Sequence, residues 1–185
     1  MAPIQFRRYE AEDVTCLQRL DEWALDDTGT DPNDIPGSDD LADVSRSYLD
    51  TGGDFVVGVI PVETDAAETV PPAVAKGLTI GAEILVAMGG FLPSESGYAD
   101  ERTVPGAAEL HRMRVAPPLQ GRGYGTELLD ALESRVRGAG FPLVLATTSR
   151  RQVAAIEFYK ARGYEQVGES RMGEYDLVHF EKRLD

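Results

Sequence analysis

A glycine-rich hexapeptide, Gln120-Gly121-Arg122-Gly123-Tyr124-Gly125, constrains the fold of this chain more than any other feature. It follows an extended run at 109–115 and precedes apolar residues that recur with a helical period, namely Leu128, Leu129, Leu132 and Val136. Glycine lets the backbone turn tightly and approach a ligand, because no Cβ stands in the way. The amides of such a turn, with the positive end of a helix behind them, form an anion site. The turn therefore predicts binding of a phosphate or pyrophosphate.

Two common phosphate-binding motifs do not fit this turn. The P-loop requires Lys followed by Ser or Thr after its second glycine, and the chain has neither there. The dinucleotide fingerprint requires a glycine where Thr126 stands, and an acidic residue closing the next strand, where the apolar run 141–148 lies. The pattern that fits is [QR]-x-x-G-x-[GA], preceded by Val115-Ala116-Pro117. In this pattern the chain resembles the GNAT superfamily of N-acetyltransferases, where it is the coenzyme A signature.

A second motif downstream strengthens the resemblance. Residues 152–164 are similar to the family's N-x-x-A-x-x-F-Y-x-x-x-G-F, with five positions in register: Ala155, Phe158, Tyr159, Gly163 and Tyr164. Gln152 stands where the family usually has Asn, which puts that cofactor contact in doubt. The resemblance implies the GNAT acyl-CoA N-acyltransferase fold, a single α/β (mixed α+β) domain over residues 1–185. It implies a central mixed sheet of about seven strands, flanked by about four helices, in which the strand before the turn is splayed from its parallel neighbour.

The strand before the turn also breaks the alternation of a regular strand. Its apolar residues, Leu110, Met113 and Val115, are spaced by three and then by two, whereas strict alternation keeps an even spacing. A β-bulge near His111 to Arg112 accounts for the slip, and a chance break in the pattern is the alternative. A bulge there would splay this strand from its parallel neighbour at 143–147 and free backbone groups in the gap.

The resemblance implies that acetyl-coenzyme A is the co-substrate and that no metal takes part. Its pantetheine would lie in the gap and pair with the strand backbone at 113–115. Arg122 is the preferred phosphate partner, with Arg150 or Arg151 as weaker ones. The cofactor-binding residues implied are Met113, Arg114, Val115, Gln120, Gly121, Arg122, Gly123, Tyr124, Gly125, Thr126, Gln152 and Tyr159.

The implied reaction is direct acetyl transfer, in a ternary complex, to a primary amine of a small molecule or protein. It requires an oxyanion donor, a proton donor for the departing thiolate and a base for the amine. A backbone N–H at Val115 or a neighbour suits the oxyanion, and Tyr159 occupies the family's thiolate-protonating position. His111 and Glu109 are the candidate bases, because imidazole ordinarily titrates near neutral pH and burial can adapt a carboxylate. Each of these residues could instead have a structural role. Tyr159 could be a packing residue, His111 could satisfy its hydrogen bonds at a strand edge, and Glu109 could pair with Arg112 or Arg114.

Two other functions compete with an N-acetyltransferase. A non-catalytic acyl-coenzyme A binding or sensing domain would keep the turn but lose acid-base groups, and the presence of Tyr159, Glu109 and His111 argues against it. Another phosphate-ligand protein is disfavoured by the broken P-loop and dinucleotide patterns. The acceptor and the oligomeric state stay open, and a homodimer is one option.

Composition favours a small cytoplasmic protein. No apolar run has the ~18 residues of a membrane helix, and the N-terminus lacks the design of a signal peptide. Cys16 is the single cysteine, so the chain cannot form an internal disulfide, and we expect Cys16 to be a buried packing residue. The chain has 32 acidic and 18 basic residues and just three lysines, Lys76, Lys160 and Lys182. This excess of acidic residues disfavours nucleic-acid binding. It indicates a halophilic protein whose acidic surface keeps it soluble in concentrated salt. The alternative is that the acidic residues surround the entrance of a site for a cationic substrate.

The remaining segments are expected to be connections and helices around the sheet. Periodicity predicts a helix from Val14 to about Asp27, and a second helix capped at 38–40 whose apolar face is Leu41, Val44 and Tyr48. The loop between them, 26–37, either walls the acceptor site or is a solvated connection. Segment 63–80 is predicted to be an exposed excursion, in the form of a lengthened hairpin, and 93–106 a long loop.

Overall fold

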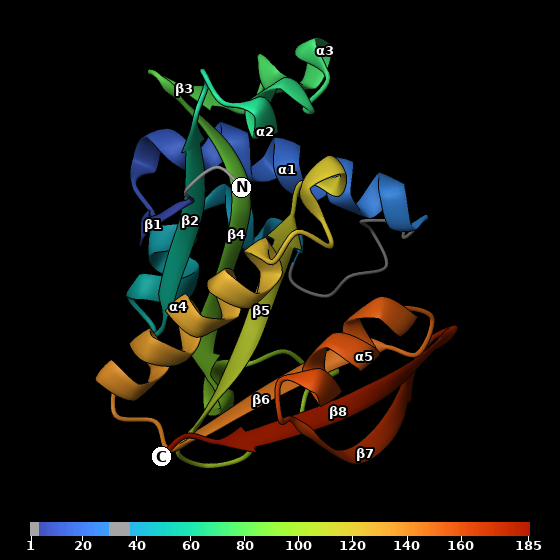
Figure 1. Ribbon diagram of the computed structural model, residues 1–185. Coiled ribbons are helices and arrows are strands. Elements are labelled where there is room, and N and C mark those ends of the chain that lie inside the picture. Colours follow the sequence, from blue (N-terminus) through green and yellow to red (C-terminus); the bar gives the residue numbers. More distant parts are fainter. Residues whose placement is uncertain (1–3, 30–37) are drawn as a thin grey trace.

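The computed structural model describes residues 4–29 and 38–185, arranged as a central sheet with helices on both faces (Figure 1). Residues 30–37 of the predicted loop lie outside the described residues. The strand order is β1-β2-β4-β5-β6-β8-β7, and the short β3 pairs with β4. The strands are β1 Gln5–Arg8, β2 Asp54–Pro61, β3 Thr79–Ile80, β4 Glu83–Pro93, β5 Ala107–Val115, β6 Leu143–Ser149, β7 Glu165–Met172 and β8 Tyr175–Arg183. The mixed α/β fold is confirmed, with β3 added to the expected strands.

Two helical layers cover the sheet because successive strand residues point to opposite faces. On one face, α4 (Tyr124–Gly138) and α5 (Val153–Ala161) pack on residues such as Val56 and Val144. On the other face, α1 (Val14–Thr28) and the segment 38–49 pack on residues such as Val57 and Met88. In Figure 1, α4 crosses the near face of the strands. The periodic residues Leu128, Leu129, Leu132 and Val136 of α4 are all at most 1% exposed, as the helical pattern predicts.

The predicted second helix is wrong as a regular helix. Residues 38–49 form a 3-10 turn at Ser38–Ala42 and a π turn at Ser45–Leu49. Its apolar face is confirmed, since Leu41, Val44 and Tyr48 are buried. Asp40 does not cap the segment but points inward, where its carboxylate accepts a hydrogen bond from Tyr48 Oη at 2.5 Å. The capping pattern predicted a regular helix wrongly because the Asp40 carboxylate is buried and bonds to Tyr48 and Arg112 rather than to the backbone amides of its own segment.

The predicted exposed excursion at 63–80 is partly wrong. It contains two short helices, α2 (Asp65–Glu68) and α3 (Pro72–Ala75), before β3 pairs with β4 as a hairpin. Four apolar residues of the segment are at most 5% exposed and join the core beside α1: Ala66, Ala67, Val70 and Leu78. These apolar side chains follow no simple period among the acids and prolines of the segment, so the sequence did not reveal that part of it packs on the core.

The bulge predicted in the strand before the glycine turn is confirmed. On β4, Met88 pairs with Arg114 and Gly90 with His111, so Gly89 alone opposes two residues of β5, Arg112 and Met113. Arg112 has φ of +53°, the one positive value among described non-glycine residues. The parallel pairing of β5 with β6 covers just 107–109 and 143–145. Beyond that point the two strands diverge, and the edge of β5 that follows Glu109 borders a gap.

Candidate active site

The glycine turn connects the end of β5 to the start of α4. Gly121 and Gly123 have φ of +71° and +95°, in the left-handed region that side chains with a Cβ rarely enter. The Gly123 carbonyl accepts hydrogen bonds from the amides of Thr126 (2.9 Å) and Glu127 (3.1 Å), which closes the first turn of the helix. Gln120 Nε2 donates to the Val115 carbonyl at 3.1 Å and ties the turn to β5. The turn thus presents helix N-terminal amides toward the gap between β5 and α5.

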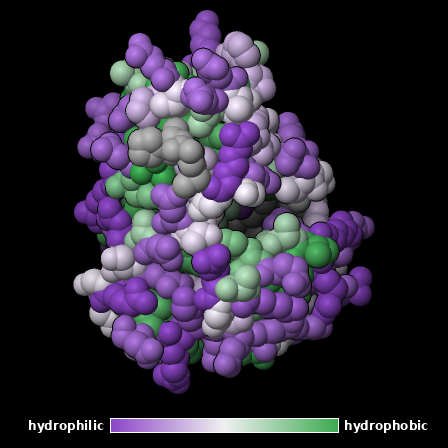
Figure 2. All heavy atoms as spheres, viewed as in Figure 1, coloured by the Kyte–Doolittle hydropathy of each residue, from purple (hydrophilic) through white to green (hydrophobic). Residues whose placement is uncertain are grey.

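A cleft with a cavity volume of about 740 Å³ follows this gap. Its walls are the end of β5, the turn, α5 and the C-terminal end of α1, and Figure 2 shows a hollow on this face of the molecule. Eight of the residues expected to bind the cofactor line the cleft: Met113, Arg114, Val115, Gln120, Gly121, Gly125, Gln152 and Tyr159. Val153 also lines it and is 65% exposed, so the cleft carries apolar surface open to solvent.

The other four expected cofactor residues do not line this cleft. Arg122 is exposed, and Tyr124 is 1% exposed within the core cluster beside α1. Gly123 and Thr126 belong to the turn and to the first turn of α4. A ligand at this turn would therefore meet Gly123 and Tyr124 through their backbone amides, whereas the exposed Arg122 could also reach it with its side chain.

Gln152 stands at the N-terminal cap position of α5, where the family motif has Asn. Its side chain makes no capping hydrogen bond, and its backbone N–H donates to the Ser149 carbonyl at 2.9 Å. The longer side chain lines the cleft instead.

A second cavity, of about 200 Å³, continues from the first. The two share wall residues from β5 and α5, including Met113, Arg114 and Tyr159. At its far end the second cavity reaches His111 and the loop residues Tyr98, Asp100 and Glu101. Two adjoining cavities therefore extend from the glycine turn to an acidic end beside His111.

Tyr159 lies at the junction of the two cavities. The residue is 8% exposed, and Oη donates to Met113 Sδ at 3.5 Å, so the phenol bridges α5 and the bulged part of β5. Burial raises the pKa of the phenol above its usual value, and the nearby Glu109 carboxyl raises it further. The side chain therefore keeps its proton and is available as an O–H donor at the junction.

Glu109 and His111 lie two residues apart on β5, but in different settings, and Glu109 lines neither of the two cavities. Glu109 is 1% exposed, and neither carboxylate oxygen has a hydrogen-bond partner among the described residues. Burial, reinforced by Glu101, raises the pKa of this carboxyl well above its usual range. Neither candidate base pairs with Arg112 or Arg114 in the described structure; His111 lines the second cavity, with Nε2 3.3 Å from Glu101 Oε1.

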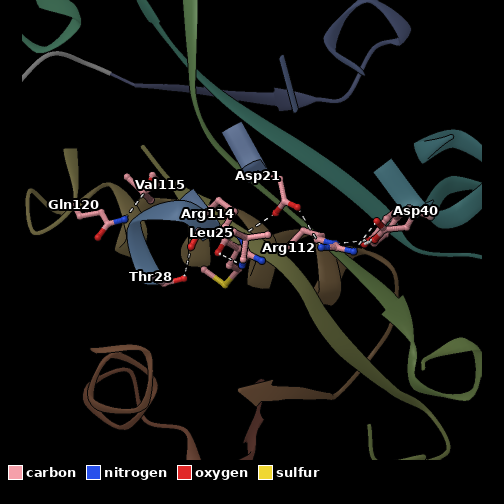
Figure 3. A network of polar contacts seen from close by, with 10 residues as sticks. Asp21, Leu25, Thr28, Asp40, Arg112, Arg114, Val115 and Gln120 are labelled. Carbon is pink, nitrogen blue, oxygen red and sulfur yellow. Dashed lines mark hydrogen bonds and ion pairs between the residues drawn. The ribbon is translucent and has the colours of Figure 1, made fainter. Parts of the chain in front are cut away.

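The bulge is held by a network of buried ion pairs (Figure 3). The Arg112 guanidinium lies 3.0 Å from Asp40 and 3.4 Å from Asp21 of α1. Arg114 Nε lies 3.0 Å from the other oxygen of Asp21. The network links α1 and the segment 38–49 to the strained residue of β5, and it gives each of the two arginines an aspartate partner.

Four acidic residues of this region escaped the sequence analysis. Asp21 and Asp40 belong to predicted helical segments, and Asp100 and Glu101 to a predicted loop without a motif. The contacts of Asp21 and Asp40 with Arg112 reach across 91 and 72 residues, and neither periodicity nor spacing reports such contacts. The sequence held one indirect signal. Asp21 and Asp40 lie beside the apolar face of their segments, and a charge buried there requires an oppositely charged partner.

Comparisons with known proteins agree with the geometry. A family model described as “Acetyltransferase (GNAT) family” matches residues 66–164, more than half of the 185 residues. An uncharacterized N-acetyltransferase of Methanocaldococcus jannaschii is 30% identical over 77 residues. That match covers 42% of this chain and 34% of the relative, about a third of the relative's length.

Solved structures of the same fold cover nearly the whole chain. A GNAT-family acetyltransferase from Staphylococcus aureus Mu50 has a TM-score of 0.72 at 14% identity, covering 99% of this chain and 100% of its own. The PaiA N-acetyltransferase from Thermoplasma acidophilum, in complex with coenzyme A, has a TM-score of 0.67 at 15% identity, with 98% and 99% covered. The yncA structure from Salmonella typhimurium, with its cofactor acetyl-CoA, has a TM-score of 0.66 at 19% identity, with 98% and 94% covered. None of the helices within residues 4–29 and 38–185 has the length and apolar content of a transmembrane span.

Proposed function

This chain belongs to the acetyltransferase (GNAT) family, and we propose that it moves an acetyl group from acetyl-coenzyme A to a primary amine. The observation that carries this proposal is the pair of adjoining cavities between the glycine turn and His111, both of which Tyr159 lines. A cofactor in one cavity and an amine in the other would meet at the Tyr159 phenol. Simultaneous binding of both favours direct transfer in a ternary complex, because proximity replaces a bimolecular step.

The larger cleft suits the pyrophosphate and the pantetheine arm of the coenzyme. Backbone amides at the turn and the start of α4 would hold the pyrophosphate, assisted by the positive helix end. The pantetheine arm would run along the part of β5 that no longer pairs with β6, with Met113 to Val115 as its backbone partners. Val153 and Phe158 supply apolar surface that the coenzyme would cover.

The transfer itself needs three groups near the junction. The amine nitrogen attacks the thioester carbonyl, a C–N bond forms, and the C–S bond breaks as the thiolate leaves. A backbone N–H at Val115 or a neighbour would stabilise the oxyanion that develops, and Tyr159 would protonate the thiolate. Because its pKa is raised, the phenol enters the reaction with its proton in place.

The amine must also lose a proton before it attacks. His111 lines the acceptor cavity, so we assign proton removal to its Nε2, directly or through a water molecule. Glu109 is the alternative base. Its raised pKa means that it holds a proton over a wider pH range and becomes a base only as the pH rises. The two assignments therefore predict different pH profiles.

A thiol-release assay tests the proposal. The protein is incubated with acetyl-coenzyme A and a panel of amines that includes amino acids, alkylamines, polyamines and peptides with free N-termini. Release of coenzyme A thiol should depend on the amine and fall in Tyr159→Phe, while calorimetry shows that both proteins bind acetyl-coenzyme A. Tight acetyl-coenzyme A binding without amine-dependent thiol release across the panel would instead indicate a binding or sensing domain.

A further inference from the structure

We propose that the acceptor taken by this site is a dicationic amine, an alkyl chain with the reacting amine at one end and a second positive charge at the other. This inference rests on the acetyl transfer proposed above and specifies its substrate class. It concerns the far end of the smaller cavity, where Asp100 and Glu101 face His111.

The loop before β5 fixes the second of these acids, Glu101, in place. Glu101 Oε2 accepts a hydrogen bond from the Tyr98 amide at 2.9 Å. A Cβ at Gly97 would lie 2.4 Å from the same oxygen, so the close approach of the carboxylate requires glycine there. Ser94 Oγ braces the loop, since it accepts from the Val104 amide at 2.9 Å and donates to the Arg102 carbonyl at 2.8 Å. The acidic end is therefore a held arrangement rather than a solvated stretch of loop.

The charges at this end are unbalanced. The two arginines that line the cavity are already opposed by aspartates, Arg112 by Asp40 and Arg114 by Asp21. The other nearby arginine, Arg102, pairs with Glu181 at 3.0 Å. Within residues 4–29 and 38–185, no lysine or arginine forms an ion pair with Asp100 or Glu101. A cation that enters the cavity would therefore complete the charge balance.

Buried polar atoms without partners point to the same ligand. Asp100 Oδ1 and His111 Nε2 are shielded from solvent, and neither makes a hydrogen bond to a described residue. The His111 side chain is 5% exposed, and its contact with Glu101 is an ion pair just when the imidazole is protonated. Burial, with Glu101 next in effect, raises the pKa of the Asp100 carboxyl. An ammonium group between the two acids would give Asp100 Oδ1 a donor and relieve their mutual repulsion, and His111 Nε2 would remain the acceptor for the proton of the reacting amine.

The smaller cavity also has apolar walls suited to an alkyl chain. Met172 and Leu177 line the cavity together with Tyr98 and Tyr175. Burial raises the pKa of Tyr98 to about 12, with Asp40 adding to the effect, so this side chain stays uncharged at neutral pH. An acceptor with an alkyl chain and a cationic tail matches this combination of apolar and acidic walls.

A matched series of acceptors tests the inference. Pentylamine, diaminopentane and aminopentanoate share a reacting amine on a five-carbon chain and differ in the charge of the tail. The series is repeated with three- and seven-carbon chains, and kcat/KM is measured by thiol release at saturating acetyl-coenzyme A. At the best chain length, the dicationic amine should be preferred over the neutral-tailed one by ~10- to 10³-fold, and the anionic tail should be poorest.

Two variants separate charge from shape. The double change Asp100→Asn with Glu101→Gln should move the diamine-to-monoamine ratio of kcat/KM toward one, and Asp100→Asn alone carries this test if the double variant does not fold. Asp130→Asn, at an exposed position of α4, removes one negative charge as Asp100→Asn alone does, and it should leave the ratio unchanged. Calorimetry of diaminopentane with the coenzyme A-saturated protein gives a readout independent of turnover, and the binding should weaken in the double variant.

The outcomes distinguish this inference from the proposed function. If no amine is acetylated, the proposed function fails. Two other results would refute the dicationic acceptor and leave the proposed function intact. One is equal acetylation of amines with neutral and cationic tails, and the other is a diamine-to-monoamine ratio of kcat/KM that is unchanged in the double variant. A preference for the anionic tail would refute it as well.

Discussion

Substituting Glu109 by glutamine should change how the stability of this protein depends on pH. Glu109 is 1% exposed and both of its carboxylate oxygens lack hydrogen-bond partners among the described residues. Burial raises its pKa in the folded state above the ordinary value of 4.5. Between 4.5 and the raised folded value, the folded protein holds a proton that the unfolded chain has released, so the free energy of unfolding falls as the pH rises. Glutamine cannot titrate, and Glu109→Gln removes this contribution.

The magnitude follows from proton linkage. One proton of difference between the two states changes the free energy of unfolding by about 1.4 kcal/mol per pH unit. Relative to the wild type, Glu109→Gln should gain up to this amount for each pH unit above about pH 5, until the folded pKa is passed. The unpartnered amide of the variant has its own cost, of about 1–3 kcal/mol, but that cost does not depend on pH. The prediction therefore concerns how the stability difference between Glu109→Gln and the wild type changes with pH, not the size of that difference at one pH.

Urea denaturation from about pH 5 to about pH 8 measures this slope at one ionic strength and one protein concentration. Glu133→Gln is the matched control, because Glu133 is 4% exposed but accepts hydrogen bonds from Lys182 at 2.8 Å and Tyr164 at 3.0 Å. The stability of that variant should not improve relative to the wild type as the pH rises. If the curves of Glu109→Gln and the wild type run parallel over the whole range, Glu109 does not have a raised pKa and the account of this carboxyl is wrong.

Other predictions concern the reaction, the turn and the surface. Tyr159→Phe should lower kcat by roughly 10²–10⁴-fold while calorimetry shows acetyl-coenzyme A affinity retained, and a kcat within about twofold of wild type would make Tyr159 a packing residue. Gly123→Asp should abolish acetyl-coenzyme A binding in calorimetry, because φ is +95° there and the new charge opposes the pyrophosphate; Gly125→Ala, whose Cβ would lie 3.7 Å from the nearest side-chain atom, should bind normally. His111→Gln should depress the kcat/KM plateau and remove its acid limb, whereas an unchanged profile with loss in Glu109→Gln would assign proton removal to Glu109. With a net charge of −14, the melting temperature should rise from low to molar salt, and a flat response would refute a halophilic adaptation.

The parts of the site that depend on local backbone were predictable from the sequence. Spacing alone indicated the bulge, because Leu110 and Met113 could not both face the core of a regular strand. Glycine at 121 and 123 indicated a turn with positive φ, and both residues adopt it. The two motifs also placed Tyr159 near the bulged strand, and its phenol contacts Met113.

The parts that depend on contacts across the chain were not predictable. Asp40 and Arg112 are separated by 72 residues, and their ion pair converts a predicted helix cap into a brace for the bulge. The acidic end of the acceptor cavity comes from a loop whose sequence is unremarkable, and it acquires meaning only when the fold sets Glu101 beside His111. Periodicity and spacing report local structure, whereas ion pairs of this kind are made by tertiary packing.

Direct transfer is tested most sharply by following the acetyl group itself. The protein is mixed in a single turnover with acetyl-coenzyme A labelled in the acetyl carbons, with and without an amine that the thiol-release assay has identified. Mass spectrometry of protein and small molecules then locates the label over time. The account predicts that the label moves to the amine nitrogen at the rate of thiol release, and that none is attached to the protein when the amine is left out. Label bound covalently to the protein without amine, or thiol release without a labelled amine product, would contradict it.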